Sequence, residues 1–318
     1  MFQPASPHHK STSRATRHVP STRPFAVEWV TLLLMGLCFG FWFAAVWLLP
    51  GVSLFLSCVV LTLVLVLHAS LTHEVLHGHP FPSQWLSEGL VIINPGLFVP
   101  YLRFRDTHLA HHQDANLTDP YDDPESNYVD PVVWRTLPCW VQLLLRFNNT
   151  LAGRMAIGPA VGMFVFVRAD IRVIRAGDRQ VMFGWALHVP GLCVVLYGVA
   201  LSPMPVWLYV SAAYFALSVL KIRTFLEHQA HEKARGRTVI IEDRGLLAFL
   251  FLNNNFHVVH HMHPRVPWYR LPALYRAHSA RYLACNEGYR YQSYAEVFAR
   301  HFWRAKDSVA HPLWSSDD

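Results

Sequence analysis

The chain has 318 residues, of which 53% are hydrophobic and only 15% are charged, and its formal net charge is +6. Ordinary soluble domains carry about 25% charged residues, so this composition argues against a soluble globular protein. Basic residues that flank membrane segments account for the positive charge, and no nucleic-acid partner is needed to explain it.

We divide the chain into three parts: a disordered N-terminal tail (1–24), a membrane domain (25–300) and a C-terminal tail (301–318). The N-terminal tail is rich in Ser, Thr, His and Pro, a composition that does not form a packed core. Because about 28 mostly polar residues precede the first apolar run, we expect no cleaved signal peptide.

Four apolar runs have the length and composition of transmembrane helices. A run of about 20 residues crosses a hydrocarbon core roughly 30 Å thick. The runs form two pairs, and each pair is joined by a short uncharged turn, at 50–51 and 202–203. The runs are 29–49, 52–71, 181–201 and 204–220. The sequence therefore predicts an all-α integral membrane protein with four transmembrane helices in two hairpins.

The distribution of charge predicts the orientation in the membrane. Basic residues outnumber acidic ones before the first apolar run, whereas the two hairpin turns carry no charge. By the positive-inside rule, both termini and the segment 72–180 face the cytoplasm. Within that segment, 81–100 and 131–172 mix apolar side chains with prolines or arginines, and we expect helices that lie at the membrane surface.

Nine histidines fall in four clusters, beside the apolar runs or in the segment between them, and three clusters have helical spacing: HEVLHGH (73–79), HLAHH (108–112) and HVVHH (257–261). Residues i, i+3 and i+4 of a helix share a face, and the neutral imidazole is the commonest metal ligand in proteins. All nine lie on the predicted cytoplasmic side, so we expect a helical cap that carries a shared metal centre. The candidate ligands are His73, His77, His108, His111, His112, His228, His257, His260 and His261.

The number of histidines predicts how many ions bind, but not which metal. A zinc ion usually takes four protein ligands, so nine imidazoles exceed one zinc site. They suit two ions, each with four or five nitrogens and an open position for dioxygen or substrate. Imidazole binds iron, copper, zinc and nickel about equally well, so the spacing leaves the metal open.

Several neighbouring residues could support the ligands. Glu74, Asp106 and Glu227 lie within two residues of a candidate ligand and could either orient an imidazole or pair with a nearby arginine. We expect Asn255 to be the N-cap of the helix that carries HVVHH. The acidic stretch 118–126 is either a solvated loop, which we favour, or a contact for a headgroup or redox partner.

The other histidines are expected outside the site. His68 and His188 lie in apolar runs and are typical of buried core histidines. His79, His231 and His263 are near the clusters but are not among the expected ligands. The remaining ones are predicted to be tail or surface residues: His8, His9, His18, His278, His301 and His311.

The histidine clusters, together with Glu227-His228 and the stretch HHMHPRVPWYRLPALY, resemble the membrane fatty acid desaturase superfamily over roughly residues 30–280. This resemblance implies a centre of two iron ions held by the nine histidines, dioxygen as co-substrate and two electrons per turnover. In some members, an asparagine one turn before the histidine that corresponds to His228 contributes through a water. Thr224 stands at that position here.

The resemblance implies desaturation of a fatty acyl chain, and the alternative is a hydroxylase or ketolase of a lipid or carotenoid. The expected partners are a lipid or acyl substrate, membrane lipids and a separate electron donor such as a ferredoxin, because no cysteine cluster for an iron–sulfur centre is present. A metal transporter or sensor is a more remote alternative, since transport sites need polar residues near the bilayer midplane and these spans have almost none.

Overall fold

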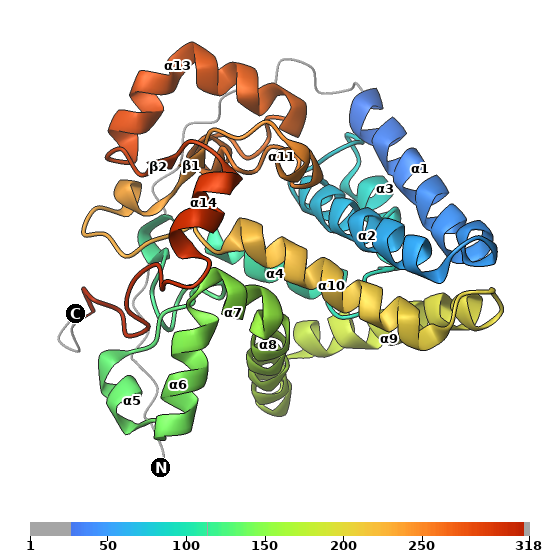
Figure 1. Cartoon of the computed structure of the whole chain (residues 1–318), viewed down its shortest axis with the longest axis horizontal. Coiled ribbons are helices and arrows are strands. Elements are labelled where there is room, and N and C mark those ends of the chain that lie inside the picture. Colours follow the sequence, from blue (N-terminus) through green and yellow to red (C-terminus); the bar gives the residue numbers. More distant parts are fainter. Residues whose placement is uncertain (1–26, 113, 315–318) are drawn as a thin grey trace.

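A computed structural model describes residues 27–112 and 114–314, and it is mainly helical (Figure 1). Two short strands, β1 (Ile240–Ile241) and β2 (Arg290–Tyr291), pair in parallel. The predicted tail at 1–24 lies outside the described residues. The helices are α1 (Trp29–Phe43), α2 (Leu54–Leu76), α3 (Gln84–Gly89), α4 (Tyr101–His111), α5 (Pro131–Thr136), α6 (Cys139–Asn148), α7 (Leu151–Ala156), α8 (Gly158–Arg175), α9 (Arg179–Ala200), α10 (Val206–Thr224), α11 (Leu246–Leu250), α12 (His257–Met262), α13 (Leu271–Cys285) and α14 (Tyr294–His301).

Four helical segments are long and apolar enough to cross a membrane, and they coincide with the four predicted runs. The segments are Trp29–Gly51, Leu54–Leu76, Arg179–Ala200 and Val206–Thr224. The first continues from α1 through a π-helical turn and a 3-10 turn. The second extends beyond the apolar run, which ends at 71, so that His73 lies in its last turn.

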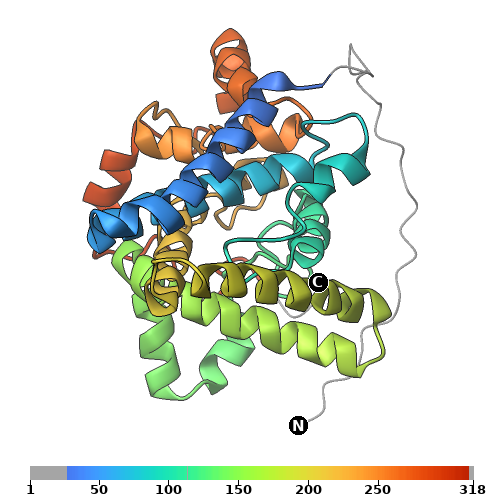
Figure 2. The same cartoon turned by 90° about the vertical axis from the view of Figure 1, so that its right-hand side faces the viewer.

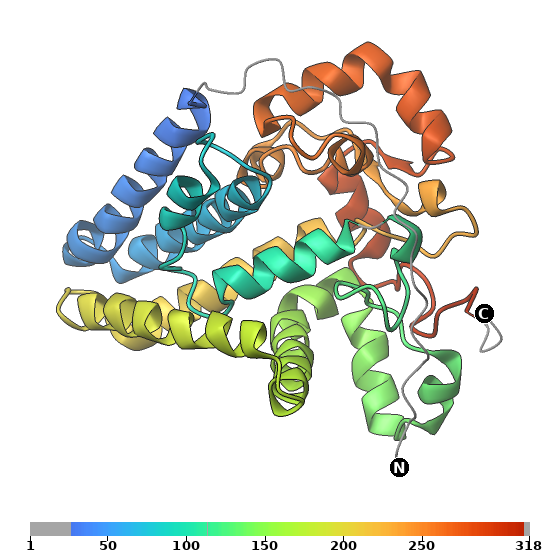
Figure 3. The ribbon, with the colours of Figure 1, turned by 180° about the vertical axis from the view of Figure 1, so that it is seen from behind.

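The four long helices pack together around α2. Helix α2 contacts α1 on one side and α10 on another, and α10 also contacts α9. The turns that join α1 to α2 and α9 to α10 lie at one end of the molecule, on the right in Figure 1 and on the left in the reverse view of Figure 3. Helices α13 and α14 and the two strands lie at the opposite end, where α2 and α10 terminate.

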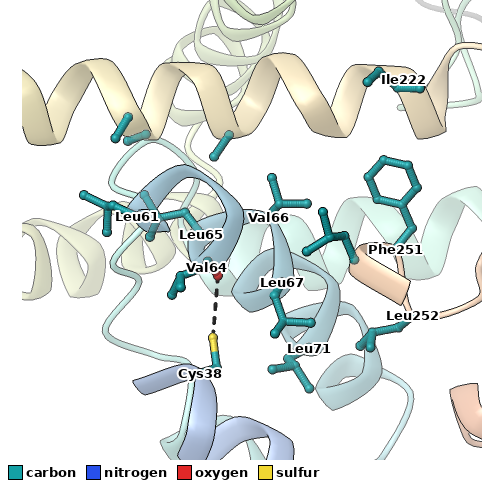
Figure 4. Packing of buried hydrophobic residues seen from close by; sticks show 14 of the residues in the cluster. Cys38, Leu61, Val64, Leu65, Val66, Leu67, Leu71, Ile222, Phe251 and Leu252 are labelled. Atoms are coloured by element: carbon teal, nitrogen blue, oxygen red, sulfur yellow. Dashed lines mark hydrogen bonds between the residues drawn. The ribbon is translucent and has the colours of Figure 1, made fainter. Parts of the chain in front are cut away.

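The apolar core continues from the long helices into the C-terminal part of the chain. Figure 4 shows Leu67 and Leu71 of α2 near Phe251 and Leu252, which follow α11. All four side chains are buried in the same hydrophobic cluster. This packing fixes the last turns of α2, and therefore the first histidine cluster, against the segment that leads into α12.

The amphipathic region predicted at 131–172 forms helices α5 to α8. Several of its large apolar side chains are exposed, among them Trp140 of α6 and Phe164 of α8. Helix α8 packs against α9 and α10, and Figure 2 shows it running alongside α9. None of the helices α5 to α8 is one of the four candidate spans. Their exposed apolar side chains fit the predicted position at a membrane surface.

The segment after α14 packs against the body of the protein as far as residue 314, although we predicted a C-terminal tail from 301. Bridges join Val129 to Ala310 and Thr150 to Ala305. The Nζ of Lys306 donates a hydrogen bond to the backbone oxygen of His228. Residues 302–314 therefore contact one of the candidate ligand segments directly.

Candidate metal centre

The first histidine cluster lies where α2 ends. His77 is the C-cap of α2, and Gly78 follows with φ of +99°, a left-handed conformation that glycine adopts without strain. Because His73 is one turn before His77, their rings lie side by side, with centroids 4.8 Å apart.

The other clusters reach the same place from three further segments. Helix α4 carries His108 and His111, and α12 carries the three histidines of HVVHH. His228 lies beyond the end of α10, in the loop before β1. Packing of the long helices and of the C-terminal segment thus brings together histidines that lie up to 188 residues apart in the sequence.

All nine predicted histidines converge, and they form two groups. Within each group, the candidate ligand atoms lie within 4.8 Å of one another. The first group has five members, namely His73, His77, His108, His112 and His260. The second group has four, namely His111, His228, His257 and His261. Each group has the four or five imidazoles expected for one of two ions, while ligation by each residue stays a prediction.

Distances between ring nitrogens within each group match those of ligands on a common ion. In the first group, His108 Nε2 lies 3.0 Å from His73 Nε2 and 3.0 Å from His112 Nε2. In the second, His228 Nε2 lies 2.9 Å from His111 Nε2 and 3.1 Å from His257 Nε2. Two nitrogens bound about 2.1 Å from one ion at a right angle are about 3.0 Å apart.

The Nδ1 atoms of three candidate ligands contact oxygen acceptors on the side away from the converging nitrogens. His108 Nδ1 lies 2.9 Å from Glu125 Oε1, and His111 Nδ1 lies 2.8 Å from Asp123 Oδ1. His257 Nδ1 lies 3.0 Å from the side-chain oxygen of Asn254. When such a ring is neutral, its proton lies on Nδ1, which leaves a lone pair on Nε2 for a metal.

When the rings are neutral, the state that binds a metal, hydrogen bonds alone do not satisfy the converging nitrogens. With their Nδ1 protons donated elsewhere, neutral His111 and His257 offer only acceptors at Nε2. His228 Nε2 lies between them and carries at most one hydrogen, so it cannot serve both. A cation at the meeting point would bind all three lone pairs, so this donor set fits a metal ion.

Burial favours the neutral, metal-binding form of most of these rings. It is the main cause that lowers the pKa of His228, His257 and His260 well below the usual value, and the neighbouring histidines lower it further. Burial also opposes the charged form of His111, but the carboxylates of Glu125 and Asp123 outweigh it and raise the pKa of His111 to about 9. A bound cation supplies the positive charge that these two carboxylates favour.

The acidic stretch 118–126 is not the solvated loop that we favoured. Asp123 is buried, and it accepts hydrogen bonds from the backbone N–H groups of Thr118 and Glu125. The loop presents two carboxylates to the histidines of α4. The sequence did signal acidic residues shortly after HLAHH, but we considered only carboxylates within two residues of a ligand.

The carboxylates that we did consider have different positions. Asp106 pairs with Arg105 and Gln180, not with a histidine. Glu74 Oε1 lies 3.8 Å from His73 Nδ1, and Glu227 Oε1 lies 3.8 Å from His257 Nδ1. These two lie beside the site at more than hydrogen-bond distance.

Of the polar residues that precede His257 and His228, Asn255 does not have the position that we expected. Asn255 is not the N-cap of α12, because its side-chain nitrogen donates to the backbone oxygens of Ile241 and Asp243. Its neighbour Asn254 contacts His257 instead. The Thr224 hydroxyl oxygen is buried and has no hydrogen-bond partner among the residues that the structure describes.

The histidines predicted outside the site do lie outside both groups wherever the structure describes them. His79 pairs with Glu28, and His231 lies near Glu287. His188 is buried and bonds to the backbone oxygen of Leu97, as expected for a core histidine. His311 contradicts the prediction of a tail or surface residue, because it is buried.

The fold and the site define a helical membrane protein with a histidine cluster that could hold metal ions. The family model for fatty acid desaturases matches residues 50–294, more than half of the chain, and the chain therefore belongs to the fatty acid desaturase family. This is a di-iron family of oxidoreductases of the desaturase and hydroxylase type, and the match includes all nine histidines.

A comparison with curated proteins finds a distant relative that is named for its reaction. The β-carotene ketolase of Paracoccus sp. (strain N81106 / MBIC 01143) is 25% identical to the chain over 211 residues. The similarity covers 64% of this chain and 71% of the ketolase.

Proposed function

We propose that this protein is a membrane di-iron oxidoreductase that uses dioxygen and two electrons to desaturate a fatty acyl chain. The observation that carries the proposal is the pair of histidine groups at the ends of α2, α4 and α12, with five and four members. Membership of the fatty acid desaturase family supports iron as the metal and a lipid as the substrate.

The residues of the chain have three tasks in this reaction. Iron bound by the two groups supplies the activation of dioxygen that cleavage of an unactivated methylene C–H bond requires. The histidines hold the ions, and Glu125, Asp123 and Asn254 hold the rings in one tautomer and orientation. Six of the nine histidines are buried and three are partly buried, which limits the access of water to the reacting groups.

The overall reaction balances with the components that we propose. A saturated –CH2–CH2– unit loses two hydrogens and becomes –CH=CH–. Dioxygen takes up these two hydrogens with two further electrons and two protons, and two waters are released. Because the site lies at the ends of the apolar helices α2 and α10, a substrate with an apolar chain can reach it from the membrane.

A second reaction is supported by the ketolase relative. On the same scaffold, insertion of oxygen at a methylene gives an alcohol, and a second insertion followed by loss of water gives a ketone. This sequence consumes two dioxygen molecules and four electrons. Hydroxylation or ketolation of a lipid or carotenoid is therefore the alternative to desaturation.

We also propose that the site and both termini face the cytoplasm and that a separate carrier such as a ferredoxin delivers the electrons. The uncharged turns at 50–51 and 202–203 lie at the end of the molecule opposite α13 and α14, which supports this orientation under the positive-inside rule. A carrier that docks on the side of α13 and α14 reaches the metal centre without crossing the membrane.

Lipid profiling by mass spectrometry tests the reaction. A host that expresses the chain should gain lipids two mass units lighter than its saturated acyl lipids, and a host that expresses His260→Ala should not. Lipids or carotenoids that gain oxygen without a new double bond would reject desaturation and support the alternative. If protein shown to contain two iron ions forms no new lipid when acyl lipids and carotenoids are supplied, both desaturation and the alternative reaction are rejected.

A further inference from the structure

Helix α8 carries a row of arginines without acidic partners. Arg168, Arg172 and Arg175 are exposed, and their spacing of four and three residues places them on one face of the helix. None of them belongs to an ion pair within 27–112 and 114–314. Three unneutralised guanidinium groups in a row create a positive surface that attracts an anion.

The same face of α8 is hollowed and partly apolar. A groove of about 740 Å³ is lined by the three arginines together with Met163, Phe164, Val167 and Ile171. The Phe164 side chain is 66% exposed. Arginines beside exposed apolar side chains match an amphipathic ligand, one with an anionic group and a hydrocarbon chain.

The connection to α9 places this groove at the membrane surface. Only residues 176–178 separate α8 from α9, and α9 is one of the four candidate spans. Asp178 caps the start of α9 by accepting hydrogen bonds from the N–H groups of Gln180 and Val181. The arginine-rich end of α8 therefore lies where a spanning helix enters the bilayer, which is the depth of lipid phosphates.

The opposite face of α8 is fixed to the helix that carries the second histidine cluster. Asp170 is buried and receives two hydrogen bonds from Arg103 of α4, at 2.9 and 3.0 Å. It also accepts a hydrogen bond from Trp185 Nε1 of α9, at 2.8 Å. Because Arg103 lies on the same helix as His108 and His111, α8 connects the groove to the metal centre.

We propose that this groove binds an anionic phospholipid of the surrounding membrane. The guanidinium groups of Arg168, Arg172 and Arg175 bind the phosphate, for which their planar donors are suited. An acyl chain lies along Phe164 and Ile171. The bound lipid holds α8, and through Asp170 and Arg103 also α4, at a defined depth in the bilayer. An acidic protein would use the arginines but not the apolar floor of the groove, so we favour the lipid.

Native mass spectrometry of the full-length, iron-loaded protein tests this proposal. The protein in detergent is titrated with phosphatidylglycerol or with phosphatidylcholine of the same chains, and the bound lipids are counted. We expect the wild type to retain phosphatidylglycerol preferentially. In Arg168→Gln/Arg172→Gln/Arg175→Gln, affinity for phosphatidylglycerol should fall by about fivefold for each arginine removed. The single variant Arg172→Gln should show about one fivefold step and replaces the triple variant if that does not fold.

The matched control removes the same charge elsewhere. Arg235, Arg281 and Arg304 are also exposed, and their replacement by Gln should leave phosphatidylglycerol binding unchanged. Equal binding by the wild type and the α8 variants would overturn the proposal. So would an equal loss in the control, which would indicate general charge attraction, or complete displacement of the lipid by an equimolar amount of inorganic phosphate, which would indicate a site for the free anion.

Discussion

At the scale of single residues, the two nitrogens of each imidazole have separate roles. Where the structure gives both contacts, Nδ1 faces an oxygen acceptor and Nε2 faces other ligands, as for His108 and His111. The acceptors are negative for these two rings, because Glu125 and Asp123 supply them. The carboxylates therefore orient the rings and also increase their basicity toward a metal.

Replacement of Glu125 by Gln tests this role. The amide keeps an oxygen that can accept from His108 Nδ1, but the negative charge is lost. We expect metal affinity to fall by about 10-fold to 100-fold, as is typical when a group that supports a ligand is changed. Chelator competition followed by metal analysis measures the change, with the exposed Glu232→Gln as the control. Unchanged affinity in Glu125→Gln would show that this carboxylate does not support the site.

His311 has a structural role that its position near the C-terminus did not suggest. Its Nε2 lies 3.3 Å from the Thr118 hydroxyl, and its ring contacts Tyr128. We expect His311→Ala to lower the free energy of unfolding by about 1–3 kcal/mol, because it leaves a small cavity and a buried hydroxyl without its partner. Denaturant unfolding in detergent measures this change. The exposed His278→Ala serves as the control, and equal stability of the two variants would contradict the assigned role.

At the scale of secondary structure elements, each HxxHH pattern supplies both histidine groups. The i and i+4 members, such as His108 and His112, join one group, and the i+3 member His111 joins the other. HVVHH has the reverse assignment, because His257 and His261 belong to the second group and His260 to the first. Two short helices whose histidines meet at the site therefore share both groups, and each contributes to both candidate ion positions.

The position of α4 depends on its ion pair with α8. Replacing Arg103 by Met leaves the Asp170 carboxylate buried without its cation, and we expect a loss of about 3–5 kcal/mol in the free energy of unfolding. The double variant Arg103→Met/Asp170→Asn removes the buried charge while the amide oxygen can still accept from Trp185. A double-mutant cycle should therefore show that the second substitution recovers part of the loss. Strictly additive losses would mean that the two side chains are not coupled.

At the scale of the whole molecule, the site is built from segments that the long helices bring to one end. The C-terminal segment contributes as well, since Lys306 binds the backbone of His228 and His311 N bonds to the Val129 oxygen. The metal centre, the carboxylate loop 118–126 and the C-terminal segment therefore form one contiguous unit at the ends of α2 and α10.

The sequence predicts the four candidate spans and the nine histidines that converge, because each depends on a local pattern. Apolar runs of about 20 residues and histidines at i, i+3 and i+4 are visible without a fold. The sequence could not predict that His111 and His260 belong to a different group from their neighbours, since this depends on how α4 and α12 lie relative to each other. The roles of Asp123 and His311 were missed for the same reason: each acts through a partner distant in the sequence or a turn that the pattern does not specify.

Metal content per chain tests the central claim, that the nine histidines form two ion sites. Elemental analysis of the purified protein should find two iron ions per chain. His260→Ala should weaken the ion of the five-member group and His257→Ala that of the four-member group, and each variant should keep close to one ion. His278→Ala should keep both. A protein that binds no transition metal, or whose metal content is unaffected by His260→Ala and His257→Ala, would contradict the claim.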